Sequence, residues 1–351
     1  MRRASSGVGL VRAGGARLRR TWDGRRRMSE ACDLLPAVLQ EVAARSDAPG
    51  AAGWVLHSAH VSGTQVVVLK VGPPGGPATA VVKMPATAEG VASQRREADV
   101  LAALGAEESL GDLAGLVPPR LAQGAVAGRV FTVERLVPGV EGRAQLADPV
   151  AGPRVVDAAA AVIGELHRRT GNTIVVDDGV LERWVEARLR VLAAAFGDRA
   201  AMDRLASRLR GAFKGRSVDV AWVHGDFWPG NVIFDPGTLE VTGIIDWEWA
   251  GPGELPAHDL LYLLIQTRML TRGRELGHVL HALLEGAPWE PAERTILAAG
   301  GVIGEGEAAV EPEVLLLVWL RHVASNLVQS PGDARNWIWT SRNVESVLRL
   351  V

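Results

Sequence analysis

The segment His224–Asn231 (HGDFWPGN) and the segment Ile244–Glu248 (IIDWE) constrain this chain more than any other part of its sequence. Two short β-prone runs, 221–223 and 232–234, flank the first segment, which is rich in glycine and proline. This pattern predicts a loop held between two strands. Such a loop is a rigid support for polar side chains, because both of its ends are fixed.

A second turn follows this loop. Asp235-Pro236-Gly237 is a typical turn sequence, and residues 241–245 form a further β-prone run. The runs on either side of the turn therefore predict a hairpin. We expect this hairpin to bring Asn231 close to Asp246.

Three polar residues of these segments carry the side chains that phosphoryl transfer from Mg-ATP requires. Asp226 offers a carboxylate to receive a hydroxyl proton. Asn231 and Asp246 offer oxygen atoms to Mg²⁺, a hard cation that is usually held by few protein ligands together with phosphate oxygens. In the alternative interpretation, His-Gly-Asp is a chance triplet and Asp246 caps a helix. The presence of all these parts, in order, favours the first interpretation.

The pattern H-G-D-x-x-x-x-N followed by I-D-W-E resembles the catalytic core of the aminoglycoside phosphotransferase and choline kinase-like families of small-molecule kinases. The resemblance covers about residues 50–330, and its specific positions lie between Trp222 and Asp259. It implies an α+β, two-lobed, protein-kinase-like fold. The small lobe would be an antiparallel β-sheet with one helix, and the other lobe would be mainly helical and carry the catalytic hairpin. It also implies ATP and Mg²⁺ as cofactors.

The resemblance gives each polar residue of the loop a role. Asp226 would accept or orient the proton of the substrate hydroxyl, while Asn231 and Asp246 would bind Mg²⁺. His224 could itself act as a general base, since its unperturbed pKa lies near ~6.5. In kinase-like loops the equivalent histidine instead packs beneath the loop, and we expect that role. Asp259 is expected to brace the loop and cap the following helix.

Lys83 is one of three lysines in an arginine-rich chain and stands in a β-prone run. Kinase-like folds use a strand lysine to hold the α- and β-phosphates; the alternative is an edge-strand lysine that points to solvent. In the resembling families a helical glutamate pairs with this lysine. Glu97, in the predicted helix 92–104, is the best candidate unless it is an ordinary solvated acid. Glu134 ends a strand that resembles the hinge at the adenine pocket.

The phosphate-covering loop is the weakest part of the resemblance. It should lie near residues 58–64, where Ser62 and Gly63 could donate backbone N–H groups, but no G-x-G-x-x-G is present. No G-x-x-x-x-G-K-[ST] occurs either, which excludes a P-loop nucleotidase as far as a motif can. The D-F-G to A-P-E pattern of protein kinases is also absent, since Trp247 follows Asp246.

Acids and tryptophans are frequent after Asp246. Acidic clefts attract polycationic aminoglycosides, and tryptophans stack on sugar faces or cage a quaternary ammonium group. Both features also have a structural interpretation, as solvated acids and core tryptophans. We expect Trp228, inside the loop, and Glu248, beside Asp246, to contact the acceptor.

Charge is distributed unevenly along the 351 residues. The net charge is −2 and 48% of the residues are hydrophobic, which is typical of a globular protein without a nucleic-acid partner. Residues 1–27 carry nine arginines, one acid and no apolar period, so residues 1–28 are predicted to be a disordered basic tail. A transit peptide, or translation from Met28, are the alternatives. We expect an N-terminal nucleotide-binding lobe at 29–136 and a C-terminal catalytic and substrate-binding lobe at 137–351.

The single cysteine, Cys32, excludes an intramolecular disulfide and a cysteine-based zinc site. The longest apolar run near the C-terminus, 314–320, is too short to span a bilayer. We therefore expect a cytoplasmic protein without membrane partners, as a monomer or homodimer.

Two functional hypotheses follow from the sequence. The leading one is an ATP- and Mg-dependent phosphotransferase that moves the γ-phosphate to a hydroxyl of a sugar, an amino sugar such as an aminoglycoside, or an amino alcohol. The alternative is a catalytically silent kinase-like protein that binds a nucleotide or metabolite and regulates a partner. The weak phosphate loop favours the alternative, whereas the complete set of loop residues together with Lys83 favours the enzyme.

Overall fold

The structure is a computed structural model that describes residues 7–45, 48–62, 65–304 and 306–351. The chain divides into two compact units. The first unit holds the residues up to Gln94 together with 118–136, and the second holds 95–117 together with 137–351. The boundary after Gln94 lies inside helix α2 (Ala88–Gly105).

The first unit contains a five-stranded antiparallel sheet with the strand order β1-β2-β3-β5-β4. The strands are β1 (Val55–Val61), β2 (Val66–Gly72), β3 (Ala80–Pro85), β4 (Arg120–Val126) and β5 (Arg129–Arg135). Strand β3 is central, because β2 and β5 pair with its two edges. Its valines and methionine suit a pleated, buried position.

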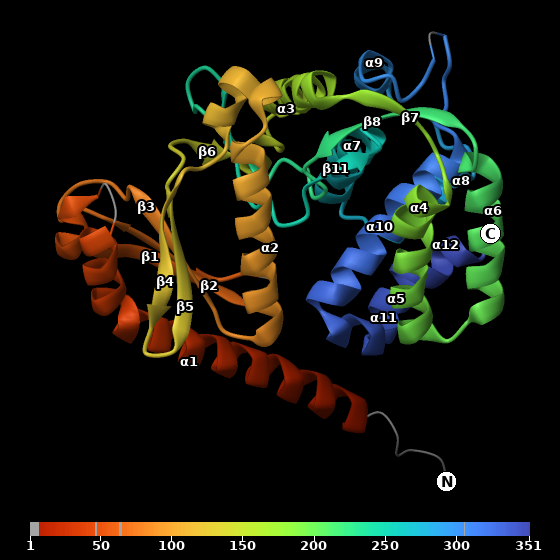
Figure 1. Cartoon of the computed structure of the whole chain (residues 1–351). Coiled ribbons are helices and arrows are strands. Elements are labelled where there is room, and N and C mark those ends of the chain that lie inside the picture. The colour runs from red at the N-terminus through yellow and green to blue at the C-terminus, as the bar shows by residue number, and fades with distance from the viewer. Residues whose placement is uncertain (1–6, 46–47, 63–64, 305) are drawn as a thin grey trace. The chain divides into compact units, whose positions relative to one another are not determined.

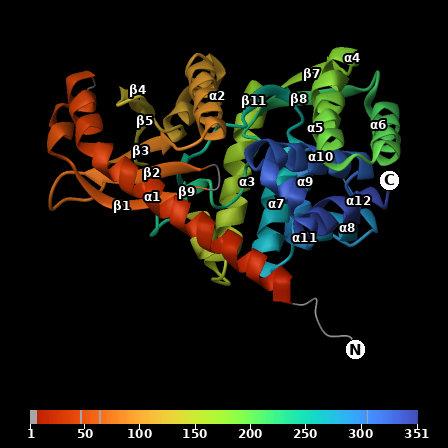
Figure 2. The same ribbon diagram turned by 90° about the horizontal axis from the view of Figure 1, so that it is seen from below.

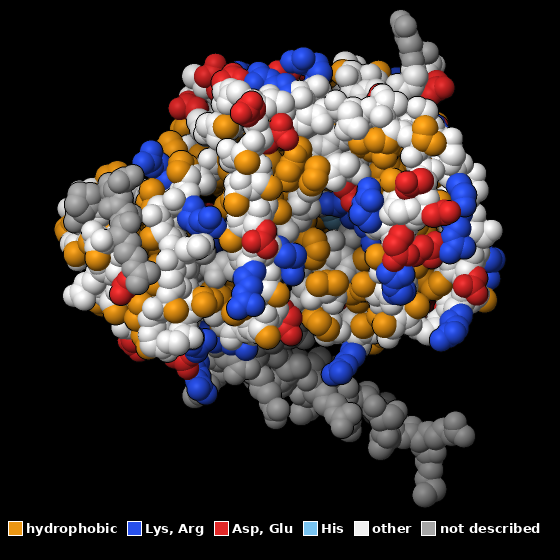
Figure 3. Space-filling view, in the orientation of Figure 1, with side chains coloured by type: hydrophobic (Ala, Val, Ile, Leu, Met, Phe, Trp, Pro, Cys, Tyr) orange, Lys and Arg blue, Asp and Glu red, His pale blue; other side chains and the backbone are white. Residues whose placement is uncertain are grey.

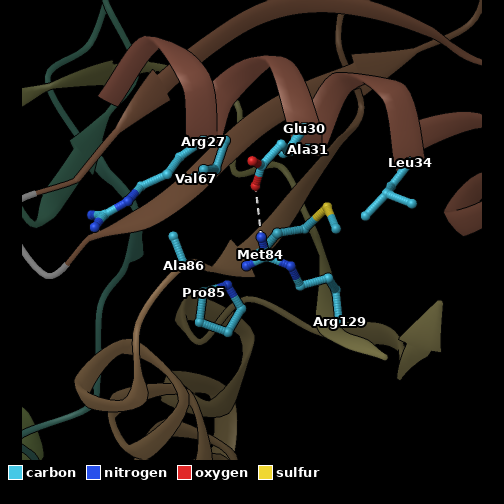
Figure 4. Close-up of a pocket in the computed structure, with 9 residues that line it drawn as sticks. All are labelled: Arg27, Glu30, Ala31, Leu34, Val67, Met84, Pro85, Ala86 and Arg129. Carbon is cyan, nitrogen blue, oxygen red and sulfur yellow. Dashed lines mark hydrogen bonds and ion pairs between the residues drawn. The ribbon is translucent and has the colours of Figure 1, made fainter. Parts of the chain in front are cut away.

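Helix α1 (Gly7–Arg45) packs on this sheet through the second half of its length (Figure 1; Figure 2). Leu35, Val38 and Val42 are buried in one cluster with the strand side chains, as their helical spacing predicts. A small surface pocket lies between α1 and the sheet, where Arg129 of β5 reaches Glu30 of α1 at 2.7 Å (Figure 4). The short 3₁₀ helix η1 (Pro49–Gly53) links α1 to β1.

The start of α1 differs from the expectation for residues 1–28, which was a disordered basic tail. The helix begins at Gly7, while residues 1–6 lie outside the described part of the chain. Arginine, which is frequent here, has high helix propensity. The missing apolar period is a signal about burial, and it does not by itself argue against a helix.

The second unit is mainly helical. Its larger helices are α3 (Ala151–Thr170), α5 (Ala187–Phe196), α6 (Arg199–Phe213), α7 (Ala257–Arg272), α8 (Leu276–Leu284), α9 (Pro291–Ala299) and α10 (Pro312–Gln329). Shorter helical segments are η2 (Glu108–Leu116), η3 (Gly142–Gln145), α4 (Asp178–Leu181), a π-helix (Glu182–Glu186), η5 (Pro331–Arg335), α11 (Trp337–Thr340), a second π-helix (Ser341–Glu345) and α12 (Ser346–Leu348). Helix α10 packs beside α5 and α7 in the centre of this unit (Figure 1; Figure 2).

Two small sheets of the second unit carry the loop predicted from the sequence. One has the order β11-β8-β7, with β7 (Asn172–Val175), β8 (Ser217–Val223) and β11 (Gly251–Glu254). The other has the order β10-β9-β6, with β6 (Val140–Glu141), β9 (Val232–Phe234) and β10 (Val241–Ile244). The loop His224–Asn231 joins β8 to β9, as its flanking runs predicted.

The expected hairpin is present as β9–β10. Val232 pairs with Ile244 and Phe234 with Val241. Asp235 forms the turn, since its Oδ1 accepts from the backbone N–H groups of the residues two and three positions later, at 2.8 and 2.9 Å. The α+β class, with an antiparallel sheet and a mainly helical second part, is confirmed. Within the described residues, no helix has the length and apolar character needed to cross a bilayer.

Candidate active site

The backbone of the loop is held by one buried carboxylate. Asp259, in the first turn of α7, is fully buried. Its Oδ2 accepts from the His224 N–H at 2.7 Å and its Oδ1 accepts from the Gly225 N–H at 2.8 Å. His167 Nε2, at the end of α3, lies 3.0 Å from Oδ2. These bonds outweigh burial and hold the pKa of Asp259 below its ordinary value. The expected bracing role is confirmed, but the N-cap of α7 is Pro256 rather than Asp259.

His224 lies beneath the loop with both ring nitrogens engaged. Nδ1 accepts from the Asp226 N–H at 3.3 Å, so Nε2 carries the proton that it donates to the Ile245 carbonyl oxygen at 2.9 Å. The ring packs against Phe227 and Trp247, with centroid distances of 5.8 and 4.7 Å. Burial lowers the pKa of His224. This arrangement suits a neutral imidazole that supports the loop backbone.

Asp226 and Asn231 are tied together across the loop. The Asn231 amide Nδ2 donates to the backbone oxygen of Asp226 at 2.9 Å and to its Oδ2 at 3.1 Å. Burial, followed by the charge of the nearby Asp246, raises the pKa of Asp226 to about 7. An aspartate whose pKa lies close to neutral pH is well matched to accepting a proton.

Asp246 has an unusual backbone conformation, with φ of +62°. Residues other than glycine rarely adopt this left-handed backbone conformation, although aspartate and asparagine tolerate it better than most. Backbone strain of this kind is concentrated at functional sites. The Ile245 N–H donates to the Asn231 carbonyl oxygen at 2.9 Å. The chain therefore leaves β10 beside Asn231, as the hairpin predicted, and turns sharply at Asp246.

The donor atoms of this loop fit a hard divalent cation. Asn231 uses its NH₂ group on Asp226, so its Oδ1 is the atom suited to a metal, and Asp246 adds a carboxylate. The charges of Asp246 and Glu248 both disfavour ionised Asp226. A cation placed among these groups would relieve that repulsion. Asn231 and Asp246 are the residues that would hold Mg²⁺.

Gly225 allows a close contact that no other residue permits. Its φ is +81°, and a Cβ there would lie 2.2 Å from the Trp249 carbonyl oxygen and 2.3 Å from Arg321 Nη2. Arg321 of α10 donates to that same carbonyl oxygen at 2.7 Å. Arg321 was not predicted from the sequence as a support of the loop. Its position directly after the apolar run 314–320 could have indicated a buried arginine. A buried guanidinium requires hydrogen-bond acceptors, such as backbone carbonyl groups.

Tyr262 is a second residue of the site that was not predicted from the sequence. Its hydroxyl donates to the Asp226 carboxylate, and Gln266 Nε2 donates to that hydroxyl at 2.5 Å. The ring stacks on His322 at a centroid distance of 3.3 Å. Burial raises the pKa of Tyr262, so it stays a donor. The sequence feature that could have indicated this role is that Tyr262 is the single tyrosine of the chain and lies one helical turn after Asp259.

Tyr262→Phe is expected to lower kcat roughly tenfold, since a hydrogen bond to a charged group is worth ~1.5–3 kcal/mol. The KM for ATP and the melting temperature should change little, because the stacked ring is retained. Steady-state kinetics and thermal unfolding check both points. Gln266→Leu is the matched control, since it leaves the bond from Tyr262 to Asp226 in place and should affect kcat less. A parallel loss of stability and of ATP affinity would contradict this positioning role.

Lys83 and Glu134 form a buried ion pair inside the sheet of the first unit. Lys83 Nζ lies 3.1 Å from Glu134 Oε2, and the two residues are only 9% and 6% exposed. Lys83 is opposite Thr132 and Glu134 opposite Val81, so the pair is a diagonal contact on one face. Because β3 is the central strand, the edge-strand alternative for Lys83 is excluded. The Glu134 side chain points at Lys83, a contact that the sequence analysis did not anticipate.

Three further residues, Glu97, Ser62 and Gly63, were predicted to belong to the nucleotide site. Glu97 lies in α2 and is buried, so it is not an ordinary solvated acid. Ser62 closes the turn between β1 and β2, where its N–H donates to the Val66 carbonyl oxygen at 2.8 Å and its Oγ accepts from the Val66 N–H at 3.2 Å. Gly63 lies outside the described residues.

Trp228 and Glu248, predicted to contact the acceptor, have partners within the second unit. The Trp228 indole covers Gly230, where a Cβ would lie 2.2 Å from the ring. Glu248 Oε1 accepts from Gln329 Nε2 of α10 at 3.0 Å, and its Oε2 is 4.0 Å from an Arg96 nitrogen. Glu248 is therefore held between α10 and α2 beside the candidate metal ligands.

The five-stranded sheet, the mainly helical unit and the loop with two aspartates and an asparagine are typical of kinase-like phosphotransferases. A family model described as the phosphotransferase enzyme family matches residues 59–295. The chain belongs to this family. The resemblance noted from the sequence, and the prediction of a phosphotransferase enzyme, are thereby confirmed.

The chain is similar to several solved structures at low sequence identity, and one of them has the same fold. A Ralstonia eutropha protein, provisionally assigned as an aminoglycoside phosphotransferase, is 17% identical with a TM-score of 0.55, and the match covers 91% of this chain and 94% of that chain. The aminoglycoside phosphotransferase APH(3'')-Id of Streptomyces rimosus, in complex with ADP and streptomycin, is 18% identical with a TM-score of 0.48, covering 82% and 98%. An aminoglycoside-3'-phosphotransferase of type VIII is 22% identical with a TM-score of 0.47, covering 78% and 94%.

Proposed function

We propose that this protein transfers the γ-phosphate of ATP to a hydroxyl group of a small molecule and requires Mg²⁺. The observation that carries the proposal is the loop itself, where Asn231 is bonded to Asp226 and the hairpin presents Asp246 beside them. A base and two oxygen donors for a metal are the groups that phosphoryl transfer needs.

Each loop residue has a defined part in this proposal. Asp226 orients the acceptor hydroxyl and receives its proton at the carboxylate. Asn231 and Asp246 hold Mg²⁺, which neutralises charge on the phosphate oxygens. His224 supports the backbone, since its ring nitrogens are already engaged. Because the transition state of phosphoryl transfer is loose, positioning and charge neutralisation supply most of the catalysis.

In the first unit, we propose that Lys83 contacts the α- and β-phosphates and that Glu134 holds its ammonium group in place. The ion pair at 3.1 Å supports this, since it fixes a long, flexible side chain. Glu97 and the turn at Ser62 are further candidates for nucleotide binding. The acceptor would be a sugar, amino sugar or amino alcohol.

The Mg²⁺ dependence of ATP consumption tests the proposal directly. Asp246→Asn is expected to raise the Mg²⁺ concentration for half-maximal activity by at least about 10–100-fold, because a carboxylate ligand is lost and even a residue that only orients a ligand contributes that much. Asp235→Asn is the matched control in the same hairpin, and it should behave like wild type because it lies at the exposed turn. A Mg²⁺ titration of ADP formation is the measurement. Equal Mg²⁺ requirements in both variants would contradict the assignment of Asp246.

Lys83→Met is expected to raise the KM for ATP roughly tenfold or more, because one phosphate contact worth ~1.4 kcal/mol or more is removed. It also leaves Glu134 buried without this cation, so stability should fall. The double variant Lys83→Met with Glu134→Gln removes the stranded charge and should regain stability without regaining ATP affinity. Kinetics and thermal unfolding of the three proteins separate the two effects. Recovery of ATP affinity in the double variant would overturn the role of Lys83.

A further inference from the structure

Most of the described acids that follow Asp246 in the second unit are paired with arginines, whereas Glu285 contacts His281 and Glu307 accepts from the Gly304 N–H. The least exposed pairs involve Glu254, which accepts from Arg188 at 2.9 Å and from Arg321 at 2.8 Å, and Glu293, which accepts from Arg268 Nε at 2.7 Å. More exposed pairs join Arg216 to Glu311, Arg208 to Glu313 and Arg272 to Glu290. The same alternation of basic and acidic side chains is visible over α5 and α6 in Figure 3, where Arg190 pairs with Glu182 and Arg210 with Glu186.

The acid nearest to the candidate metal ligands is also partly neutralised. Glu248 accepts from Gln329 and faces the guanidinium of Arg96, and its side chain is only 13% exposed. Arg96 in turn is partly exposed and contacts Glu248 only at 4.0 Å. The surroundings of Asp246 therefore include the positive charge of Arg96 as well as the negative charge of Glu248.

Of the six tryptophans that follow Asp246, four are covered by arginine or buried in the core. The Arg96 guanidinium lies 4.8 Å from the Trp249 ring centroid, and the Arg268 guanidinium lies 4.6 Å from that of Trp289. Trp247 and Trp319 are fully buried core residues. Trp337, which is 76% exposed, is a single ring, whereas an ammonium cage needs several converging faces.

These contacts change which ligands the part of the second unit after Asp246 can bind. A carboxylate that accepts guanidinium hydrogen bonds adds little negative potential to a cleft, and a polycation could use it only by breaking the pair. A tryptophan face covered by arginine repels an incoming cation. With charges balanced in this way, net charge is a weak basis for recognising an acceptor here, and hydrogen bonding is the basis that remains.

We propose that the acceptor is an uncharged polyol or sugar, and that polycationic aminoglycosides and quaternary ammonium alcohols are excluded. This inference rests on the proposed phosphotransferase function and narrows its substrate class. The electrostatic consequence is specific. Turnover of an uncharged acceptor is insensitive to salt, whereas that of a polycation steered by acids falls steeply as salt rises.

The full-length protein with Mg-ATP is assayed for ADP formation against neutral hexoses, pentoses and inositols, and against kanamycin, neomycin and choline. Each assay is run at about 0.01 M and about 1 M salt, where the Debye length falls from ~30 to ~3 Å. We expect at least one neutral compound to be phosphorylated with a kcat/KM that changes less than about twofold when the added salt screens surface charge. Preferred, salt-sensitive turnover of kanamycin, neomycin or choline would overturn the inference, as would the absence of turnover with every neutral compound.

A variant pair tests the cause of the exclusion. Arg96→Ala uncovers Trp249 and leaves Glu248 without its guanidinium, so kanamycin should bind roughly tenfold more tightly by calorimetry, a change of ~1.4 kcal/mol. Arg272→Ala removes the same charge from the exposed pair with Glu290, and it should not alter kanamycin binding. Equal kanamycin affinities in the two variants would show that the Arg96 contacts exclude nothing.

The same assays distinguish a protein that is not a phosphotransferase from a phosphotransferase with a cationic substrate. A protein that is not a phosphotransferase would form no ADP with any acceptor, cationic or neutral, and Asp226→Asn would leave this background unchanged. A phosphotransferase with a cationic substrate would instead form ADP with the cations in an Asp226-dependent manner.

Discussion

Asp226→Asn is expected to reduce phosphoryl transfer by about 10²–10⁴-fold, the range attributed to a general base, while it stabilises the Mg²⁺-free protein above neutral pH. The first effect follows because an amide cannot accept the hydroxyl proton. The second follows because burial and the charge of Asp246 raise the pKa of Asp226 to about 7. Keeping this carboxylate ionised in the folded protein therefore costs free energy.

The pH dependence of this stability effect has a defined sign. The pKa of Asp226 is higher in the folded state than the unfolded value of ~3.9, so the folded state binds more protons between about pH 4 and 7. The contribution of Asp226 is present below pH ~4 and is lost as the pH rises through 7. Each pKa unit corresponds to about 1.4 kcal/mol, and partial exposure of the side chain reduces the total effect. We therefore expect the free energy of unfolding of Asp226→Asn to exceed that of wild type by about 2 kcal/mol at pH ~8.5 and by almost nothing at pH ~4.

Thermal unfolding in EDTA at the two pH values, together with the kinetic assay, checks this prediction. Asp203→Asn makes the same chemical change on the exposed surface of α6, and it should alter neither stability nor activity. Bound Mg²⁺ would lower the pKa of Asp226 and diminish the stability difference. A variant that is inactive but no more stable than wild type at high pH would contradict the electrostatic part of the prediction.

Asp259→Ala is expected to lower the free energy of unfolding by about 3–5 kcal/mol, the range for breaking a buried charged interaction. The carboxylate accepts from the His224 and Gly225 N–H groups and contacts His167, so its removal leaves all three groups buried without this partner. The loop that carries Asp226 would lose its support, and activity should fall with stability. Chemical denaturation measures the first effect.

Two comparisons sharpen the prediction for Asp259. Asp259→Asn keeps the shape but replaces one acceptor oxygen with an NH₂ group facing a donor, so its cost should be intermediate. Asp219→Ala, which removes an exposed acid bonded to Thr173, should change stability by less than ~0.5 kcal/mol. The pKa of Asp259 is depressed in the folded state, so its contribution is present above pH ~4 and is lost as the pH falls through the folded pKa. Similar costs for the alanine variants of Asp259 and Asp219 would refute the bracing role.

The strands around the loop could be predicted from the sequence because their signals are local. β9 occupies the expected residues, and the turn at Asp235 uses the predicted chemistry. β4 was not predicted, since Arg120–Val126 contains a glycine and few β-branched residues. It is a strand because it pairs with β5 along its length, and pairing between strands overrides a weak local propensity.

The partners of the charged residues could not be predicted, because they come from distant parts of the chain. Glu134 was interpreted as part of an adenine pocket, yet its side chain pairs with Lys83 on the neighbouring strand. Tyr262 and Arg321 carry no motif, but they meet the loop through α7 and α10. Contacts of this kind depend on helix packing, which the spacing of apolar residues constrains only loosely.

The sequence by itself indicated the proposed chemistry, since two aspartates and an asparagine at fixed spacing on a strand–loop–hairpin are a local pattern. It also determined the α+β class. The tertiary structure alone decided which charges are already satisfied. The pairing of Glu248 and Glu254 with arginines, and the arginine that covers Trp249, turn a region that reads as acidic and aromatic into one with balanced charge. The physical reason is that an ion pair depends on distance and burial, and a linear sequence specifies neither.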